Sequence, residues 1–290
     1  MEQNSRNAQN SQNSQNSQNA QNAQNSEYIH PHIKLSTYEA QFFKTDVLFE
    51  EHLLVWLISG ETKIIQADKT HIFRAGDTLL FPRNQLVKVI SYPKDGLPHQ
   101  SASIHLTADW LKEYYEKNKA KAVRPHPPEF RTFGRHPLLQ SFLASLIPYF
   151  DLKELLPEAI AAGKIEEAVN ILRTIDGDID GLLASFGDPG KIDLASFMEK
   201  NYMFNMSLDK FGYLTGRSLT TFKRDFKKTF NTTPQKWLTQ RRLQLAHHEL
   251  AEKKRKPGEV YLEAGFENFS HFSYAFKKHF GYPPTHPGSQ

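Results

Sequence analysis

The stretch that decides the fold runs Ser207-Leu-Asp-Lys-Phe-Gly-Tyr-Leu-Thr-Gly-Arg-Ser218 and continues with Phe222-Lys-Arg-Asp-Phe226. Both terminal serines of the first segment are typical helix N-caps, because a serine hydroxyl can accept a hydrogen bond from a free N–H of the first turn. Between them, three large apolar residues fall on one helical face: Leu208, Phe211 and Leu214. Since Gly216 permits a tight turn, the pattern predicts a helix, a turn and a second helix.

A second copy of this pattern follows at an offset of 50 residues. The recurring positions are three phenylalanines, a pair of lysines and a proline: Phe222, Phe226 and Phe230 return as Phe272, Phe276 and Phe280, Lys227-Lys228 as Lys277-Lys278, and Pro234 as Pro284. Gly216 has a near counterpart in Gly265, one residue out of register. Self-similarity at one offset indicates two copies of a supersecondary unit. The sequence therefore predicts a double helix-turn-helix in residues 190–290, and such motifs place their second helix in the major groove of DNA.

The two second helices are expected to expose different side chains. When the phenylalanines face inward, the outward face of the first unit collects Thr220, Lys223, Arg224 and Lys227. Long cations reach guanine edges or phosphates, and threonine offers a hydroxyl and a methyl group. The outward face of the second unit collects Asn268, Ser270, Ser273, Tyr274 and Lys277. This second face is less cationic, so we expect weaker base recognition from it.

A long helical run joins the two units. Residues 235–254 contain no glycine or proline and keep large apolar residues at helical spacing. At 1.5 Å per residue such a helix spans about 30 Å, and successive major-groove segments on one face of DNA lie about 34 Å apart. A stiff connector of this length would allow one chain to seat both units on the same duplex. The alternative is an ordinary helical domain whose phenylalanines only form a core.

The distribution of charge favours a polyanion as the partner of this region. The 290 residues include 36 Lys and Arg against 32 Asp and Glu, a net charge of only +4. Residues 191–290 hold 17 basic and 9 acidic residues, a balance of +8, which leaves −4 for residues 1–190. A basic third beside an acidic remainder is typical of a nucleic-acid-binding module joined to another domain, although a basic solvated face alone would give the same count.

These residues resemble the AraC/XylS family of transcription regulators. The resemblance covers residues 194–288 and rests on the segments quoted above, together with Gly265-Phe266, Phe272, Phe276-Lys-Lys278, Phe280-Gly281 and Pro284. The string Leu-Thr-Gly-Arg-Ser followed by Phe-Lys-Arg-Asp-Phe is similar to the branch of type III secretion activators. The family implies a sequence-specific regulator, usually an activator, that contacts double-stranded promoter DNA and RNA polymerase.

The same resemblance implies which residues contact DNA. Thr220, Lys223 and Arg224 match the base-contacting positions of the first unit, and Ser270, Ser273 and Tyr274 match those of the second. Three residues depart from the family pattern: Tyr261 in place of alanine, Tyr274 in place of arginine and Pro287 in place of an aromatic residue. We therefore expect the second unit to contribute less to specificity. The full expected set is Arg217, Ser218, Thr220, Thr221, Lys223, Arg224, Lys227, Asn268, Ser270, His271, Ser273, Tyr274 and Lys277.

The region before this domain changes its pattern twice. Residues 27–107 hold short β-branched and aromatic runs separated by turn residues, which predicts an all-β barrel or sandwich. Within it, Ala75-Gly-Asp77 followed by Phe81-Pro82 is similar to the turn and strand of cupin domains. Residues 108–189 switch to helical spacing and predict a helical connector, a candidate surface for a homodimer. Residues 1–26, with 7 Gln, 8 Asn and 5 Ser, predict a disordered tail because they offer too little apolar surface to fold.

Composition and missing motifs exclude many other functions. Without cysteine the chain has no disulfide, thiolate metal site or Cys nucleophile. No apolar run approaches the roughly 18 residues of a membrane span and no signal peptide precedes the domains, so we expect a cytoplasmic protein without membrane contact. No His-x-His pair lies within the predicted strand core, and no phosphate-binding or esterase motif occurs. We therefore expect no metal, no other cofactor and no catalytic residue.

The combined interpretation is an α+β multidomain chain: an N-terminal cupin-like β-barrel, a helical connector and a C-terminal all-α domain with two helix-turn-helix units. The favoured function is sequence-specific regulation of transcription, controlled by a small-molecule or protein effector at the N-terminal domain. Trp56, Phe73 and Phe81 are candidate pocket residues there, with core packing as their alternative role. Two other interpretations stay open: a cupin-type enzyme, and a ligand-binding module, each with an accessory basic helical domain.

Overall fold

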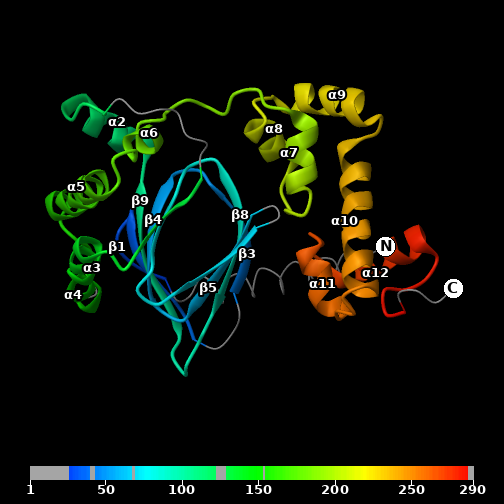
Figure 1. Ribbon diagram of the computed structural model, residues 1–290, viewed down its shortest axis with the longest axis horizontal. Helices are drawn as coiled ribbons and strands as arrows, with labels where there is room; N and C mark the ends of the chain where they lie inside the picture. The colour runs from blue at the N-terminus through cyan, green and yellow to red at the C-terminus, as the bar shows by residue number, and fades with distance from the viewer. Residues whose placement is uncertain (1–25, 40–42, 67–68, 122–128, 153, 287–290) are drawn as a thin grey trace, which may run out of the picture. The chain divides into compact units, whose positions relative to one another are not determined.

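The computed structural model describes residues 26–39, 43–66, 69–121, 129–152 and 154–286. The chain divides into two compact units, one of residues 1–65 with 70–186 and one of residues 66–69 with 187–290 (Figure 1). We call them the strand-rich unit and the helical unit. The tail predicted for residues 1–26 lies outside the described residues except for Ser26, and Pro287 lies outside them as well.

The strand-rich unit contains a six-stranded antiparallel sheet. Its strands follow the order β1 (Ser26–His30), β2 (Ile33–Tyr38), β9 (His99–Leu106), β4 (His52–Ser59), β7 (Thr78–Phe81) and β10 (Arg131–Gly134). Successive side chains of a strand point to opposite faces, so each strand contributes to two surfaces. In the β4–β9 pairing Leu54 lies opposite Ile104, and both are buried in the core that the helices cover.

A second sheet has four strands in the order β3 (Phe43–Phe49), β8 (Gln85–Tyr92), β5 (Glu61–Gln66) and β6 (Lys69–Arg74). Apolar side chains from both sheets form a smaller core: Leu57, Ile64, Phe73, Leu79, Phe81 and Val87. Among the described residues no strand of one sheet pairs with a strand of the other, so both sheets stay open. The predicted strand-rich domain is confirmed, but closure into a barrel is wrong, because strand periodicity identifies strands without fixing which edges pair.

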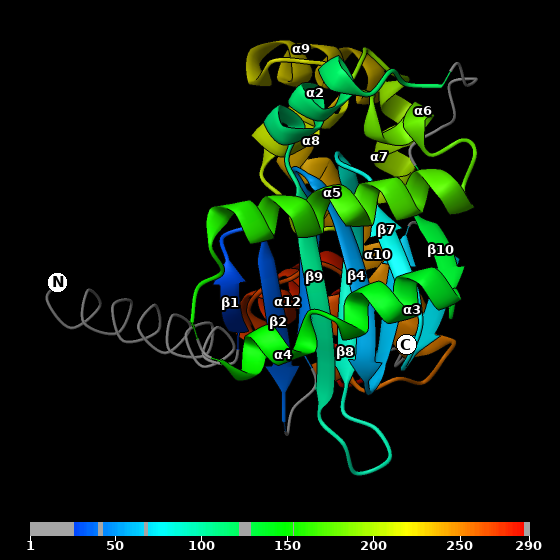
Figure 2. The same cartoon turned by 90° about the vertical axis from the view of Figure 1, so that its left-hand side faces the viewer.

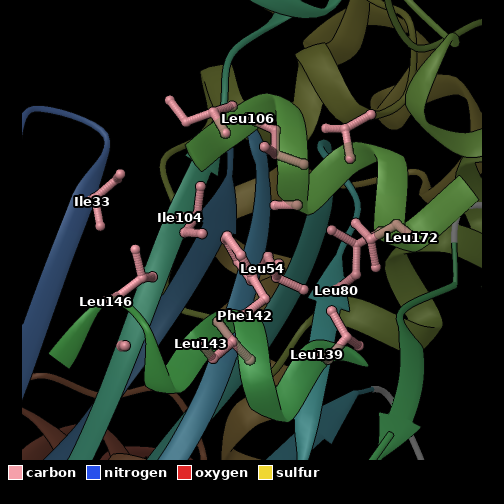
Figure 3. Packing of buried hydrophobic residues seen from close by; sticks show 14 of the residues in the cluster. Ile33, Leu54, Leu80, Ile104, Leu106, Leu139, Phe142, Leu143, Leu146 and Leu172 are labelled. Carbon is pink, nitrogen blue, oxygen red and sulfur yellow. The ribbon is translucent and has the colours of Figure 1, made fainter. Parts of the chain in front are cut away.

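Helices cover one face of the six-stranded sheet. They are α2 (Ala108–Lys117), α3 (Pro137–Ala144), α4 (Ile147–Asp151), α5 (Glu158–Ile175) and α6 (Asp180–Leu183). Figure 2 shows α3, α4 and α5 lying across the strands. In Figure 3, Phe142 and Leu143 of α3 pack beside Leu54, Leu80 and Ile104 of the sheet. The predicted helical segment is therefore part of the core of this unit, and it also contains strand β10, which the sequence pattern did not predict.

The helical unit has six helices among its described residues. They are α7 (Leu194–Asn201), α8 (Leu208–Leu214), α9 (Leu219–Phe230), α10 (Pro234–Ala251), α11 (Pro257–Glu263) and α12 (Phe269–Phe280). The pairs α8–α9 and α11–α12 are the two predicted helix-turn-helix units, which we call the first and the second unit. Helix α10 packs against α9, α11 and α12 and so joins them (Figure 1). No helix in the described part of the chain is long and apolar enough to cross a membrane.

Candidate nucleic-acid interface

The turn of the first unit depends on two glycines. Gly216 has a φ of +65°, a region that strongly favours glycine, and a Cβ there would lie 2.5 Å from the carbonyl carbon of Gly190. A Cβ on Gly212 would lie 2.9 Å from the carbonyl oxygen of Arg217. Gly212 therefore lets α8 approach the start of α9 closely, and Gly216 lets the turn pack against the backbone of Gly190.

Both predicted serine caps are present in the first unit. The Ser207 hydroxyl accepts a hydrogen bond from the N–H of Lys210 at 3.3 Å, and the Ser218 hydroxyl accepts one from the N–H of Thr221 at 3.4 Å. Ser218 therefore fixes where α9 begins. The exposed N-terminal half of such a helix is the part that normally enters the major groove.

A ladder of aromatic rings fixes the inward face of α9. Phe222 and Phe226 are completely buried, with their ring centroids 5.6 Å apart. Phe226 and Phe230 are 4.4 Å apart, and Trp237 from α10 closes the ladder at 4.7 Å from Phe230. Burying these rings anchors α9 to α10 and determines which residues must face outward.

The outward face of α9 is basic and accessible. Its exposed residues are Thr220, Lys223, Arg224, Lys227 and Lys228. The Arg224 side chain is 74% exposed, and its guanidinium lies 3.3 Å from the Asp225 carboxylate. Since Asp225 is beside Arg224 and does not cover it, the guanidinium remains free to reach a base or a phosphate. Thr221 is half-buried, so it offers less surface than its neighbours.

Arg217, one of the expected DNA contacts, has most of its side chain engaged within the protein. Its side chain is only 8% exposed, and its Nε donates to Asp225 Oδ2 at 3.1 Å. Its Nη1 donates to the carbonyl oxygens of Ile192 at 3.0 Å and Thr215 at 2.6 Å. Arg217 thus braces the turn against α9, and little of its guanidinium can meet a phosphate. The hydrogen bond from Arg217 is the main cause that lowers the pKa of Asp225 below its usual range.

The second unit repeats the scaffold with different chemistry. Its turn contains Gly265 at a φ of +89°, and Asn268 caps α12 by accepting hydrogen bonds from the N–H groups of Ser270 at 2.8 Å and His271 at 3.1 Å. Phe272 and Phe276 are completely buried. The cap and the aromatic ladder together fix the face that α12 turns outward.

The outward face of α12 is polar rather than strongly basic. Its exposed residues are Asn268, Ser270, His271, Tyr274, Lys277 and Lys278, whereas Ser273 is half-buried. Tyr274 is 67% exposed, the largest exposed aromatic side chain on this helix. All of the residues predicted for the second unit therefore reach the surface at least in part.

Helix α10 holds residues that sequence inspection missed. Arg242 donates hydrogen bonds to three backbone carbonyls, and His247 packs on Phe280 with ring centroids 4.7 Å apart. His247 Nε2 also lies 2.7 Å from the Tyr282 hydroxyl. The partners of both residues are remote in sequence, so these contacts could not be predicted from the helical periodicity. The 18 residues of α10 span about 27 Å, close to the predicted 30 Å.

A cavity of about 550 Å³ lies in the strand-rich unit and draws its lining from both sheets. Of the three candidate pocket residues, Phe81 lines this cavity, whereas Trp56 and Phe73 do not. Alternation along β4 explains Trp56: Leu53, Val55 and Leu57 face the cavity, whereas Leu54 and Trp56 face the helices. Phe73 packs in the core between the sheets, where its ring centroid lies 5.9 Å from that of Phe130.

Two polar groups line this cavity without a protein partner. His99 Nε2 lies 2.7 Å from Thr62 Oγ1, whereas His99 Nδ1 and Ser103 Oγ are buried and have no hydrogen-bond partner among the described residues. Burial lowers the pKa of His99 to about 4, so this imidazole is neutral at physiological pH. No group of His, Cys, Asp and Glu in the described part of the chain has the geometry to hold a metal ion.

Two family models match the chain. One, described as "Helix-turn-helix domain", matches residues 214–287, and the other, described as "ExsA N-terminal regulatory domain", matches residues 52–175. The chain belongs to the AraC family of transcription regulators. The resemblance inferred from the Leu-Thr-Gly-Arg-Ser segment is therefore confirmed, including its branch.

This AraC-family regulator has relatives that cover most of its length. It is 28% identical over 265 residues to the HTH-type transcriptional regulator ExsA of Pseudomonas aeruginosa, covering 88% of this chain and 90% of that protein. It is 29% identical over 236 residues to the virulence regulon transcriptional activator VirF of Yersinia enterocolitica, covering 79% and 86%. A crystal structure of an apo ToxT variant from Vibrio cholerae matches with a TM-score of 0.45 and 10% identity, over 88% of this chain and 96% of that one. The relatives are regulators and not enzymes, so the cupin-enzyme interpretation is wrong.

Proposed function

We propose that this AraC-family regulator activates transcription by seating α9 and α12 in two successive major-groove segments of a promoter. The observation that carries the proposal is the outward face of α9, where Lys223, Arg224 and Lys227 stand exposed on a helix fixed by its buried phenylalanines. Cations at these positions suit both guanine edges and phosphates. Such binding takes place in the cytoplasm, where a bacterial promoter lies.

The proposed contact set takes the residues expected from the sequence and keeps those that reach the surface. It keeps Ser218, Thr220, Lys223, Arg224 and Lys227 in the first unit, with Thr221 at the margin. In the second unit it keeps Asn268, Ser270, His271, Ser273, Tyr274 and Lys277. Arg217 is omitted because its guanidinium is engaged inside the protein. Contact with RNA polymerase remains a prediction from the family resemblance, and a homodimer formed through residues 108–189 remains a prediction from the sequence pattern.

The test begins by selecting the tightest duplex for the full chain from a random-sequence pool. Lys223→Ala is then expected to weaken binding to this duplex by about 1–3 kcal/mol, as for one lost base contact. Lys200→Ala is the matched control, because Lys200 is an exposed lysine on α7, outside both helices that are proposed to enter the grooves. Binding should fall with salt by about 0.9 log units per phosphate contact in each decade of salt concentration. Failure to enrich any sequence would overturn the proposal.

A second proposal concerns control of the regulator. We propose that the cavity of the strand-rich unit binds a small amphipathic effector. Its lining combines apolar side chains from both sheets with the polar groups His99 Nδ1 and Ser103 Oγ and with charged residues, among them Lys34 and Glu51. The apolar side chains can take up the apolar body of the effector, and a hydroxyl or carbonyl group could satisfy His99 Nδ1 and Ser103 Oγ. A protein effector at this unit also remains a prediction.

The uncharged fluorescent amphiphile N-phenyl-1-naphthylamine can serve as a probe of this cavity. We expect saturable binding of one probe per chain, and loss of that binding in Ser103→Trp, where the larger side chain fills the space. Ile72→Trp introduces the same side chain at an exposed position outside the cavity lining and should leave binding intact. Equal binding by both variants would contradict the proposed site.

A further inference from the structure

Arg242 lies near the middle of α10, the helix that joins the two helix-turn-helix units. Its Nε donates to the carbonyl oxygen of Tyr202 at 2.9 Å, and its Nη2 donates to that of Phe204 at 2.7 Å. Its Nη1 donates to the carbonyl oxygen of Gly265 at 3.1 Å. Tyr202 and Phe204 directly precede the first unit, and Gly265 is the turn of the second. One guanidinium therefore binds both the backbone that precedes the first unit and the turn of the second unit.

The backbone around Gly265 is shaped for this contact. A Cβ at Gly265 would lie 2.7 Å from the carbonyl oxygen of Met203 and 2.9 Å from Arg242 Nε. Beside it, Asn205 Nδ2 donates to Glu267 Oε1 at 2.6 Å. The segment before α8 and the turn before α12 thus meet directly, with Arg242 between them and α10.

We infer that Arg242 is the positioning residue that sets the orientation of α12 relative to α9, so that both helices meet successive major grooves in register. A planar guanidinium bound to three carbonyls restrains both the distance between the two units and the rotation of one relative to the other. A single contact between two helices would not restrain that rotation. The groove-matching part of this inference rests on the proposed two-segment binding. The part that concerns the relative orientation of the helices does not.

The neighbouring Arg241 provides a matched control. Its guanidinium lies 5.4 Å from the centroid of the Tyr202 ring and 5.6 Å from that of Trp237, and it pairs with Glu199. These partners lie in α7, in the segment that follows it and at the start of α10, so none of them belongs to the second unit. Arg241→Met removes a charged side chain of the same size from the same helix without cutting the link between the units.

The first measurement needs no DNA. Because the chain has no cysteine, Lys228→Cys and Lys278→Cys place two spin labels at equivalent exposed positions of α9 and α12 in the full chain. Pulsed electron paramagnetic resonance should give a narrow distance distribution in this background and in Arg241→Met. In Arg242→Met the distribution should become roughly twofold wider, because the two units then behave as loosely docked modules. Arg242→Lys should also widen it, since one ammonium cannot hold three carbonyls in the geometry of a fork.

The second measurement uses the selected duplex and a copy with one base pair inserted between its half-sites. The wild type should bind the inserted duplex at least about tenfold more weakly, because one base pair rotates the second half-site by roughly 35°. Arg242→Met should lose most of this discrimination, and Arg241→Met should keep it. A narrow, unshifted distance distribution in folded Arg242→Met would overturn the positioning role. If the wild type does not distinguish the two duplexes, two-segment binding is wrong, and the distance measurement still decides whether Arg242 orients the helices.

Discussion

The two helix-turn-helix units share a scaffold and differ in almost everything that the scaffold displays. Helices α9 and α12 each have 12 residues, begin at a side-chain cap and end at a left-handed residue, Asn231 in one and Gly281 in the other. Each carries a ladder of three phenylalanines, of which the first two are completely buried. A ring from α10, Trp237 or His247, closes each ladder at a centroid distance of 4.7 Å from the third phenylalanine. The buried residues recur because each unit packs the phenylalanines of its second helix against α10 in the same way.

The surfaces are free to diverge because packing does not restrict them. Helix α9 displays Lys223 and Arg224 on its outward face, whereas the residues 50 positions later, on α12, are Ser273 and Tyr274. The internal bracing differs too. Asp225 pairs with Arg217 inside the first unit, but the equivalent position of the second unit is Ala275. Glu267 hydrogen-bonds instead to Asn205, outside its own unit. The first unit is therefore braced internally, and the second is tied to its neighbour.

The largest expected effect tests the shared scaffold. Phe226→Ala and Phe276→Ala should each destabilise their own unit by about 3–5 kcal/mol, because both rings are completely buried at the centre of a ladder. Hydrogen exchange of the full chain would show which helices lose protection. A cost below about 1 kcal/mol for either variant would mean that this ladder does not hold its helix as described.

The next effect tests the difference between the surfaces. Arg224→Ala should weaken binding to the selected duplex by about 1–3 kcal/mol, as for loss of a base contact, with relaxed specificity at one position. Tyr274→Ala should cost less than about 1 kcal/mol if the polar face of α12 contributes mainly shape and weak contacts. Titration of labelled duplex by fluorescence anisotropy measures both. Equal losses would show that the two units recognise bases equally.

The helix caps give a smaller and more local test. Ser218→Ala and Asn268→Ala should each cost about 0.5–2 kcal/mol of stability, the range for removing an N-cap acceptor. Asn268 should lie at the upper end because it accepts from two N–H groups, whereas the hydroxyl of Ser218 accepts from one at 3.4 Å. Urea unfolding gives the comparison, and Asn268→Asp, which keeps the acceptor, should be nearly neutral. A larger cost for Ser218→Ala would reverse the assignment of the stronger cap.

The smallest effect is a difference in acid sensitivity between the units. The hydrogen bond from Arg217 holds the pKa of Asp225 below its usual value of 3.8, so the ionised form is favoured in the folded protein. This contribution to stability is fully present above about pH 4 and disappears as the pH falls through the lowered pKa of the folded state. Asp225→Asn should therefore flatten the decline in stability of the first unit below pH 4, followed by hydrogen exchange. An unchanged decline would place the acid-sensitive groups elsewhere.

Local signals explain how much of the helical unit could be predicted from its sequence. Ser207, Ser218, Gly216 and the spacing of the phenylalanines act over a single turn or helix, so caps, turns and buried faces followed from short segments. The outward face of α9 followed in the same way, because fixing the buried side of a helix fixes the exposed one.

Long-range contacts account for what the sequence did not predict. From the sequence, Arg217 is expected to be a free cation. Its guanidinium pairs with Asp225 only because of how the turn packs against α9. The carbonyl partners of Arg242 lie 40, 38 and 23 residues away, beyond any helical period. The open sheets likewise depend on which strand edges meet, and the placement of Trp56 depends on the register of β4, which a run of apolar residues leaves undetermined.

The central claim is that the two units occupy successive major-groove segments and that α9 makes stronger base contacts than α12. Base-removal interference on the selected duplex tests it directly with the full chain. We predict two clusters of required bases about 10 base pairs apart, with the stronger cluster weakened by Arg224→Ala and the weaker one by Tyr274→Ala. A single cluster, or two clusters that respond equally to both substitutions, would contradict the account.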